Sequence, residues 1–270
     1  MNAEILHLGL IDDDAIMLDS AALDLAALDH PDVDVGPLVD QLGQISERIA
    51  EAGMDAHDSA ARVAVLAQVI GGEYGFTGDR TTYDDPANAD MIRVLERRRG
   101  LPVSLAILYV AAARRLGWSA VALDTPGHVL VRVGADVEPV LIDPFSGGVE
   151  VGSDALAALL ARILGPGTKP AAGHVAAMSN RSVLVRLLLN QAMRAEKAGQ
   201  SARALTLFER MTVIAPGAGH AWWERARLEL AAGRVAAARA SLSAMLEMTR
   251  DPVRREQISD ALAALAGSDR

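Results

Sequence analysis

The stretch RRRGLPVSLAILYVAAARRLG, residues 97–117, decides the fold. Its three leading arginines suit the end of one helix, since cations are favoured near a helix C-terminus. Pro102 suits the first turn of the next helix, where its missing N–H costs nothing. A long apolar run follows and stops at Gly117, a residue type that commonly ends helices. The stretch therefore predicts a helix from about 102 to 116.

Short segments rich in Val and Leu follow this helix and are separated by turn residues. They run from Ser119 to Leu123, from His128 to Val133 and from Pro139 to Asp143, and they predict a three-stranded antiparallel meander. The preceding residues show helical periodicity, which predicts helices at about 14–28, 37–52, 58–70 (stopped by Gly71-Gly72) and 89–98. Helices followed by strands, without alternation of the two, predict an α+β domain.

A repeat of thirty-four residues lies near the C-terminus. Small and bulky apolar residues recur at this spacing: Gly199, Ala202, Ala204, Phe208, Met211 and Ile214 return as Gly233, Ala236, Ala238, Leu242, Met245 and Met248. This is the period of tetratricopeptide helix pairs. It predicts paired helices at 181–198 with 202–215 and at 219–232 with 235–249, and a terminal capping helix at 253–266.

A cluster of Gly and Pro, residues 165–170, marks the expected domain boundary. It follows a short predicted helix that ends near Leu164. The first domain is expected to span 1–165, with its core at about 60–150. The second is expected to span 171–270 as an all-α helical array.

Composition excludes several classes of protein. The 270 residues are 51% apolar and 23% charged, which indicates a globular chain. The net charge of −9 is uneven, because residues 1–60 hold fourteen acids and one base, while residues 91–270 hold sixteen acids and twenty-three scattered bases. We expect neither nucleic acid nor a membrane as partner. The absence of cysteine and of a signal-like start predicts a cytoplasmic protein without thiolate chemistry.

The stretch at 97–117, together with Pro126-Gly127-His128 and Ile142-Asp143-Pro144-Phe145, resembles the transglutaminase-like core. More closely it resembles the bacterial SirB-type family, in which such a core precedes tetratricopeptide repeats. The resemblance implies a Cys that opens a helix and a His and an Asp on neighbouring strands, in the logic of a catalytic triad. His128 and Asp143 match the last two positions, and we expect them to be hydrogen-bonded across adjacent strands.

The nucleophile position departs from that pattern, because a gapless match places Pro102 at the Cys. Ser104 is the nearest hydroxyl. One interpretation makes it a helix cap or a packed residue, since Ser favours helix starts. The alternative makes it a nucleophile at the helix entrance, if the helix begins one or two residues later than in the thiol enzymes.

Other candidate residues are less specific. Arg97, Arg98 and Arg99 are expected to cap a helix end, or else to bind a carboxylate or acidic peptide. Trp222 and Trp223 are candidates for one core residue and one partner anchor. No metal site is expected, since Asp12-Asp13-Asp14 more commonly announces a helix start. No cofactor is expected, since no phosphate loop occurs in strand-then-helix context.

These observations favour a protein with a degenerate transglutaminase-like site that binds or scaffolds a peptide or protein partner. Thiol transglutaminase activity is excluded by the absence of cysteine. The alternative is a serine-dependent hydrolase or acyltransferase acting on amide or ester bonds. In it Ser104 attacks, His128 is the base and Asp143 orients the ring. The position of Ser104 relative to His128 discriminates between the two.

Overall fold

The computed structural model describes residues 3–134 and 138–267. The chain divides into two compact units, Asp13–Leu187 and a second made of Met1–Asp12 with Leu188–Arg270. The Gly/Pro cluster at 165–170 thus lies inside the first unit. Residues after this cluster still belong to the first unit, because a short strand at Ala176–Ala177 pairs with its sheet.

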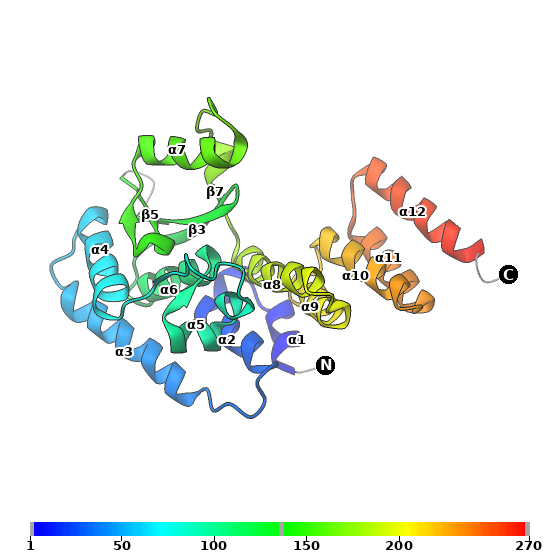
Figure 1. Cartoon of the computed structure of the whole chain (residues 1–270), viewed down its shortest axis with the longest axis horizontal. Helices are drawn as coiled ribbons and strands as arrows, with labels where there is room; N and C mark the ends of the chain where they lie inside the picture. Colours follow the sequence, from blue (N-terminus) through cyan, green and yellow to red (C-terminus); the bar gives the residue numbers. More distant parts are fainter. Residues whose placement is uncertain (1–2, 135–137, 268–270) are drawn as a thin grey trace. The chain divides into compact units, whose positions relative to one another are not determined.

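The first unit is a mixed α+β structure, as predicted (Figure 1). Its longer helices are α2 (Leu18–Ala27), α3 (Gly36–Ala52), α4 (Ser59–Leu66), α5 (Met91–Arg97), α6 (Pro102–Arg115) and α7 (Ser153–Leu164). Its short helical turns are η1 (Asp13–Ala15), η3 (Pro86–Ala89), η4 (Pro144–Ser146) and η5 (Ala172–Val175). Helix α8 (Asn180–Lys197) begins in this unit and continues into the other.

Two helix boundaries differ clearly from the predictions. The helix predicted at about 14–28 begins only at Leu18, after the short turn η1. The Gly71-Gly72 pair does not stop the helix that begins at Ser59, because the chain continues as a π-helical segment, η2 (Ala67–Glu73). A Cβ atom on Gly71 would lie 2.4 Å from the carbonyl oxygen of Gly147. Glycine at position 71 thus permits a close backbone approach, whereas the sequence pattern suggested a stop signal.

Helix α6 is the centre of the first unit. Every residue from Pro102 to Ala113 is buried, and the helix packs against α2, α3 and the sheet. Leu101 is its N-cap and Pro102 lies in its first turn. Gly117, with φ of +70°, follows its C-cap. The predicted helix at 102–116 is therefore confirmed.

Among the described residues, the main sheet has five strands in the order β6-β5-β4-β3-β7, all antiparallel to their neighbours. The predicted meander is β3 (Ala120–Thr125), β4 (His128–Val133) and β5 (Val140–Asp143). Short edge strands, β6 (Val149–Glu150) and β7 (Ala176–Ala177), extend it at either side, and neither was predicted. A separate two-stranded parallel ladder joins β1 (Thr77–Gly78) to β2 (Arg99–Gly100).

The second unit is all helical. It contains α1 (Ala3–Leu10), α9 (Ser201–Ile214), α10 (Gly219–Ala231), α11 (Val235–Met248) and α12 (Pro252–Gly267). Helix α9 packs against α10, α10 against α11 and α11 against α12, while α1 packs against α9. Pairs of buried residues thirty-four positions apart include Ala204 with Ala238, Phe208 with Leu242 and Met211 with Met245. Gly199 and Gly233 both adopt positive φ, of +74° and +71°, at equivalent turns.

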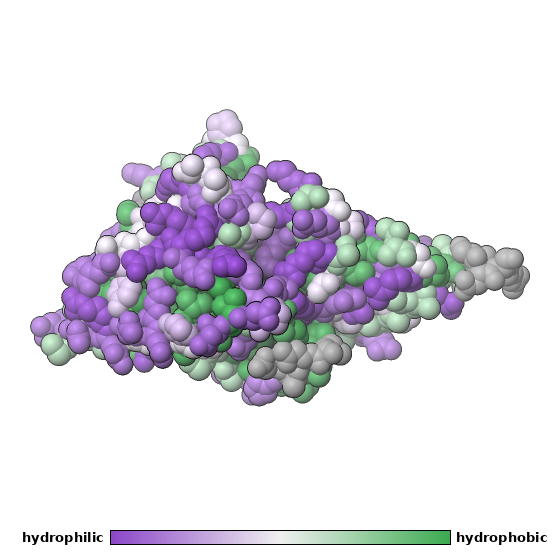
Figure 2. All heavy atoms as spheres, turned by 60° about the horizontal axis from the view of Figure 1, so that its bottom comes forward, coloured by the Kyte–Doolittle hydropathy of each residue, from purple (hydrophilic) through white to green (hydrophobic). Residues whose placement is uncertain are grey.

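Polar and charged residues cover most of the face shown in Figure 2, and hydrophobic residues are gathered into smaller areas. The apolar half of the composition is accordingly placed mainly in the interior of each unit. No helix within the described ranges is both long enough and apolar enough to cross a membrane.

Candidate functional site

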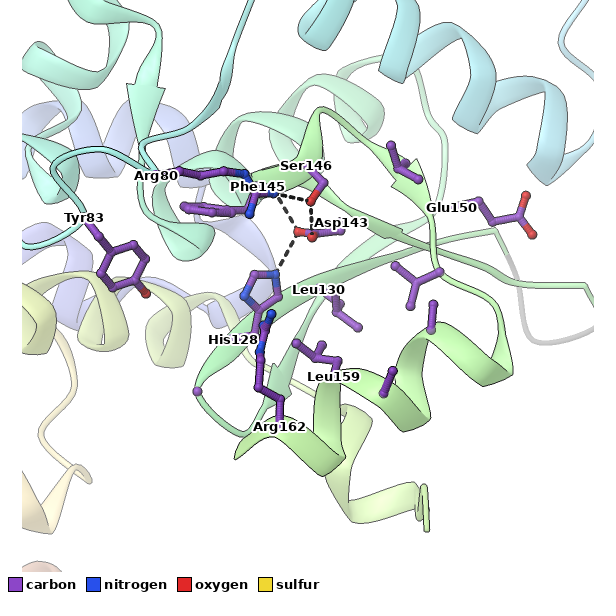
Figure 3. Close-up of a pocket in the computed structure, with 15 residues that line it drawn as sticks. Arg80, Tyr83, His128, Leu130, Asp143, Phe145, Ser146, Glu150, Leu159 and Arg162 are labelled. Atoms are coloured by element: carbon purple, nitrogen blue, oxygen red, sulfur yellow. Dashed lines mark hydrogen bonds and ion pairs between the residues drawn. The ribbon is translucent and has the colours of Figure 1, made fainter. Parts of the chain in front are cut away.

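A cavity of about 700 Å³ lies in the first unit, beside the start of β4, the end of β5 and helix α7 (Figure 3). Its lining combines charged, aromatic and aliphatic side chains. They are Arg80, Tyr83, Gly127, His128, Leu130, Asp143, Phe145, Ser146, Val149, Glu150, Val151, Ala155, Ala158, Leu159 and Arg162. A concave site with a few convergent polar groups is the usual form of a ligand-binding site.

His128 and Asp143 meet in this cavity, as predicted. The ring Nε2 of His128 lies 2.8 Å from Oδ1 of Asp143. His128 opens β4 because Pro126 and Gly127 form a two-residue hairpin loop, with Gly127 at φ of +64°. The two residues are not directly opposed, however. Because Val131 pairs with Ile142, the side chains of His128 and Asp143 meet diagonally across the ladder.

Asp143 is held by two further donors. The Phe145 N–H donates to Oδ1 over 3.0 Å, and the Ser146 hydroxyl donates to Oδ2 over 2.7 Å. Burial disfavours the charged carboxylate, but the hydrogen bond and charge of His128, with these donors, outweigh it and lower the pKa of Asp143. An ionised Asp143 accepts the Nε2 proton of His128. The Nδ1 atom is therefore the ring nitrogen left to contact a ligand.

Phe145 forms an aromatic platform beside the pair. Its ring centroid lies 5.9 Å from that of His128 and 5.8 Å from that of Tyr83, both edge to face. The guanidinium carbon of Arg80 lies 5.0 Å from the same centroid, and its Nη2 donates to the Ser146 hydroxyl over 2.9 Å. The Phe145 ring and the Ser146 hydroxyl thus hold Arg80 next to the His128–Asp143 pair.

Tyr109 lies behind the pair, fully buried on α6. Within the part of the chain that the structure describes, its hydroxyl has no hydrogen-bond partner. Burial and the charge of Asp143 both raise the pKa of Tyr109, so the phenol stays protonated. The ring packs against Gly148, where an added Cβ would lie 2.9 Å from the hydroxyl. No local sequence signal marks Tyr109, because it falls in the apolar run of α6.

Ser104 does not join this cavity. It is fully buried, and its hydroxyl donates to the carbonyl of Asn88 over 2.8 Å. Helix α6 begins at Pro102, so Ser104 lies within the first turn and is not the N-cap. Its Cβ faces Gly100, on the side of β2 and η3. The structure therefore places Ser104 as a packed residue and brings together only the His and Asp of the predicted triad.

The arginines at 97–99 also lie outside the cavity lining. Arg97 pairs with Asp79 over 3.1 Å, Arg98 is the C-cap of α5 in a left-handed conformation, and Arg99 donates to the carbonyl of Gly75 over 2.9 Å. Arg98 thus ends α5, whereas Arg97 and Arg99 bind groups on either side of β1. Arg80 and Arg162 line the cavity in their place. Both are isolated arginines in turn or helical sequence, and no local signal marks them.

The remaining candidates have structural contacts. Trp222 donates from Nε1 to the carbonyl of Pro216 over 2.7 Å, whereas Trp223 is 37% exposed. Asp13 accepts from the backbone N–H groups of Asn180 and Arg181, so it caps α8 and not its own turn. No group of three or more His, Asp or Glu side chains suited to a metal occurs among residues 3–134 and 138–267.

A transglutaminase-like core is what the fold and the His128–Asp143 site together define. The family model described as the transglutaminase-like superfamily matches residues 37–189, which span both the central helix and the sheet. The chain belongs to this superfamily.

Bacterial relatives named UPF0162 proteins are similar over most of the chain. One from Xylella fastidiosa (strain 9a5c) is 30% identical over 249 residues, 89% of this chain and 87% of that protein. One from Vibrio cholerae is 30% identical over 178 residues, 66% of either chain. The crystal structure of menin is similar with a TM-score of 0.42 and 14% identity, covering 90% of this chain and 68% of that chain.

Proposed function

We propose that the protein is a cytoplasmic, SirB-type binding protein, in which a degenerate transglutaminase-like site holds a segment of a peptide or protein partner. The cavity supplies the base and orienter of a triad, His128 and Asp143. The predicted third member, Ser104, is not among the residues that line it. The arrangement can hold a ligand by hydrogen bonds and charge without a covalent intermediate.

The observation that carries this proposal is the position of Ser104. A serine becomes a nucleophile when an adjacent base takes its proton. The Ser104 proton is already donated to the Asn88 carbonyl, in a fully buried environment away from the cavity lining. Ser146 does reach the cavity, but its hydroxyl donates to Asp143 and accepts from Arg80. Neither hydroxyl is poised to be activated by His128.

We further propose that the second unit is a short tetratricopeptide-like array that adds a second binding surface. The thirty-four-residue spacing of buried side chains on α9 and α11, and the matching left-handed glycines, support this. Trp223 is partly exposed on α10 and suits a partner anchor.

Activity-based labelling tests the absence of catalysis. The full chain is incubated with a serine-directed fluorophosphonate and, separately, with a glutamine-donor peptide and a labelled amine. We expect neither stoichiometric labelling nor transamidation. Labelling of Ser104 that disappears in His128→Ala would overturn the proposal and establish the serine hydrolase instead.

A binding experiment tests whether the cavity holds a peptide segment. Short random peptides displayed on phage are selected against the full chain. We expect enriched peptides whose binding is lost in a cavity variant, Leu159→Arg, and kept in Leu164→Arg. Leu164 is an exposed leucine on the same helix and lies outside the cavity lining. Failure to enrich any peptide that depends on the cavity would overturn it.

A further inference from the structure

The cavity beside the His128–Asp143 pair has two ends of different charge. Figure 3 shows Arg80, Arg162 and His128 at one end, where the Asp143 carboxylate is taken up by His128 and Ser146, and Glu150 at the other, with aliphatic side chains such as Leu159 between them. A ligand that spans such a cavity is oriented by its own charge distribution. The two arginines therefore indicate the chemistry of what the cavity binds.

Arg80 is prepared to bind an anion. The Phe145 ring and the Ser146 hydroxyl hold its guanidinium in place, at 5.0 Å and 2.9 Å. No carboxylate of the described residues pairs with it. Because a guanidinium carries five N–H donors in a fixed fork, most of them remain for a ligand. A group held in its binding orientation also loses little entropy when the ligand arrives.

Arg162 supplies a second cation from the last turn of α7. Within residues 3–134 and 138–267 its side chain makes neither a hydrogen bond nor an ion pair. Figure 3 shows the side chain extending from α7 toward the end of the cavity that holds His128. By contrast, Arg93 and Arg97 on α5 are both paired with carboxylates of the chain, Arg93 with Glu96 and Arg97 with Asp79.

The middle of the cavity is apolar. The side chains that form this wall come from β4 and from one face of α7 and the loop before it: Leu130, Val151, Ala155, Ala158 and Leu159. An aliphatic or aromatic side chain of a ligand would bury apolar area there. The cavity thus joins a cationic end to an apolar wall.

We infer that the cavity binds an acidic peptide that presents an Asp or Glu carboxylate next to an apolar side chain. The carboxylate lies between Arg80 and Arg162, and the apolar side chain packs on Leu159. Asp143 and Glu150 are acids of the cavity itself, and they repel a doubly charged phosphate more than a singly charged carboxylate. This inference rests on the proposed function and specifies its ligand.

Parallel peptide selection tests the inference. Short random peptides displayed on phage are selected against the full chain, against the double variant Arg80→Gln, Arg162→Gln, and against Arg93→Gln. Arg93 is a matched control, because it is an exposed arginine on α5 outside the cavity. We expect Asp or Glu beside an apolar residue in peptides from the wild type and the control, and no acidic preference in those from the double variant.

Selected peptides are then labelled and titrated by fluorescence anisotropy. We expect Glu→Gln in the peptide, or the double arginine variant, to weaken binding by about tenfold, and added salt to weaken it as well. The arginines are exposed, so circular dichroism should show that the double variant stays folded. Preferred binding of phosphoserine peptides over their Glu counterparts would overturn the carboxylate assignment.

The outcomes separate this inference from the proposed function. If peptides bind in the cavity without an acidic preference, the inference is wrong and the proposed function stands. If no peptide depends on the cavity, both are wrong.

Discussion

The His30–Asp90 and His128–Asp143 pairs of the first unit have similar geometry and different surroundings. His30 Nε2 lies 2.6 Å from Oδ2 of Asp90, and His128 Nε2 lies 2.8 Å from Oδ1 of Asp143. Asp90 is also the N-cap of α5, since it accepts from the Arg93 N–H. The His30–Asp90 pair thus fastens the loop after α2 to the start of α5.

The His128–Asp143 pair differs in what surrounds it. The Ser146 hydroxyl donates to Asp143, the Phe145 ring meets the His128 ring edge to face, and Arg80 lies over the Phe145 ring. The cavity lies beside this pair. The His30–Asp90 pair is not part of that cavity. A short His–Asp contact by itself therefore does not define a functional site. The cavity and the arginines beside His128–Asp143 distinguish this pair from His30–Asp90.

The largest effect is expected when the platform is removed. Phe145→Ala deletes a buried ring that packs on Gly78, His128, Tyr83 and Arg80. We expect a loss of about 3–5 kcal/mol in the free energy of unfolding, measured with urea, as for other buried aromatic residues. Phe145→Leu should lose less, since it keeps most of the apolar volume. Equal losses for the two variants would show that retained apolar volume does not replace the ring, and that its aromatic shape is specifically required.

The next largest loss of stability is expected to differ between Asp143→Asn and Asp90→Asn. Asp143→Asn removes a charge that accepts three hydrogen bonds, and we expect a loss of about 1.5–3 kcal/mol at neutral pH. Asp90→Asn should cost less, about 1 kcal/mol, because Asn caps a helix as well as Asp does. Chemical denaturation of both variants measures the difference. A larger loss for Asp90→Asn would reverse the comparison.

The stability lost in Asp143→Asn has an expected pH dependence. The folded pKa of Asp143 is lowered from its ordinary 3.8, so its stabilisation is fully present above that value. It is lost as the pH falls through the lower folded pKa. The difference in melting temperature between the wild type and Asp143→Asn should therefore shrink below about pH 4. A difference that stays constant down to pH 2 would contradict the cause given for the lowered pKa.

A smaller effect concerns binding. His128→Ala should weaken a cavity-bound peptide by about tenfold, or about 1.4 kcal/mol, because it removes the ring that faces the ligand. His30→Ala should leave the peptide affinity unchanged, although both variants lose a hydrogen bond to an Asp. Fluorescence anisotropy with the same peptide measures both. Equal losses would mean that the effect of His128→Ala is transmitted through stability alone.

The smallest effect on the free energy of unfolding is expected for Tyr109→Phe, and this substitution should not destabilise the protein. Tyr109→Phe removes a buried hydroxyl near the Asp143 charge, for which the described residues provide no hydrogen-bond partner. The free energy of unfolding should be unchanged or higher by up to about 1 kcal/mol. Urea denaturation checks this. A clear destabilisation would show that the hydroxyl is satisfied by an ordered water in the folded protein.

Local sequence determined the main elements and the existence of the pair. Pro102, the apolar run and Gly117 fix α6, because each acts on backbone conformation within a few residues. Pro126-Gly127 and the alternation on either side fix the β3–β4 hairpin and so place His128 at the start of a strand. The absence of cysteine in the sequence alone predicted a site without a thiolate nucleophile.

Tertiary structure decided everything that depends on residues far apart in the chain. The diagonal meeting of His128 and Asp143 follows from strand register, and the burial of Ser104 follows from the Asn88 carbonyl, sixteen residues away in sequence. Arg80 and Arg162 enter the same cavity from a turn and a helix that share no sequence pattern. Propensity and spacing act locally, whereas a cavity is formed by packing, which brings distant segments together.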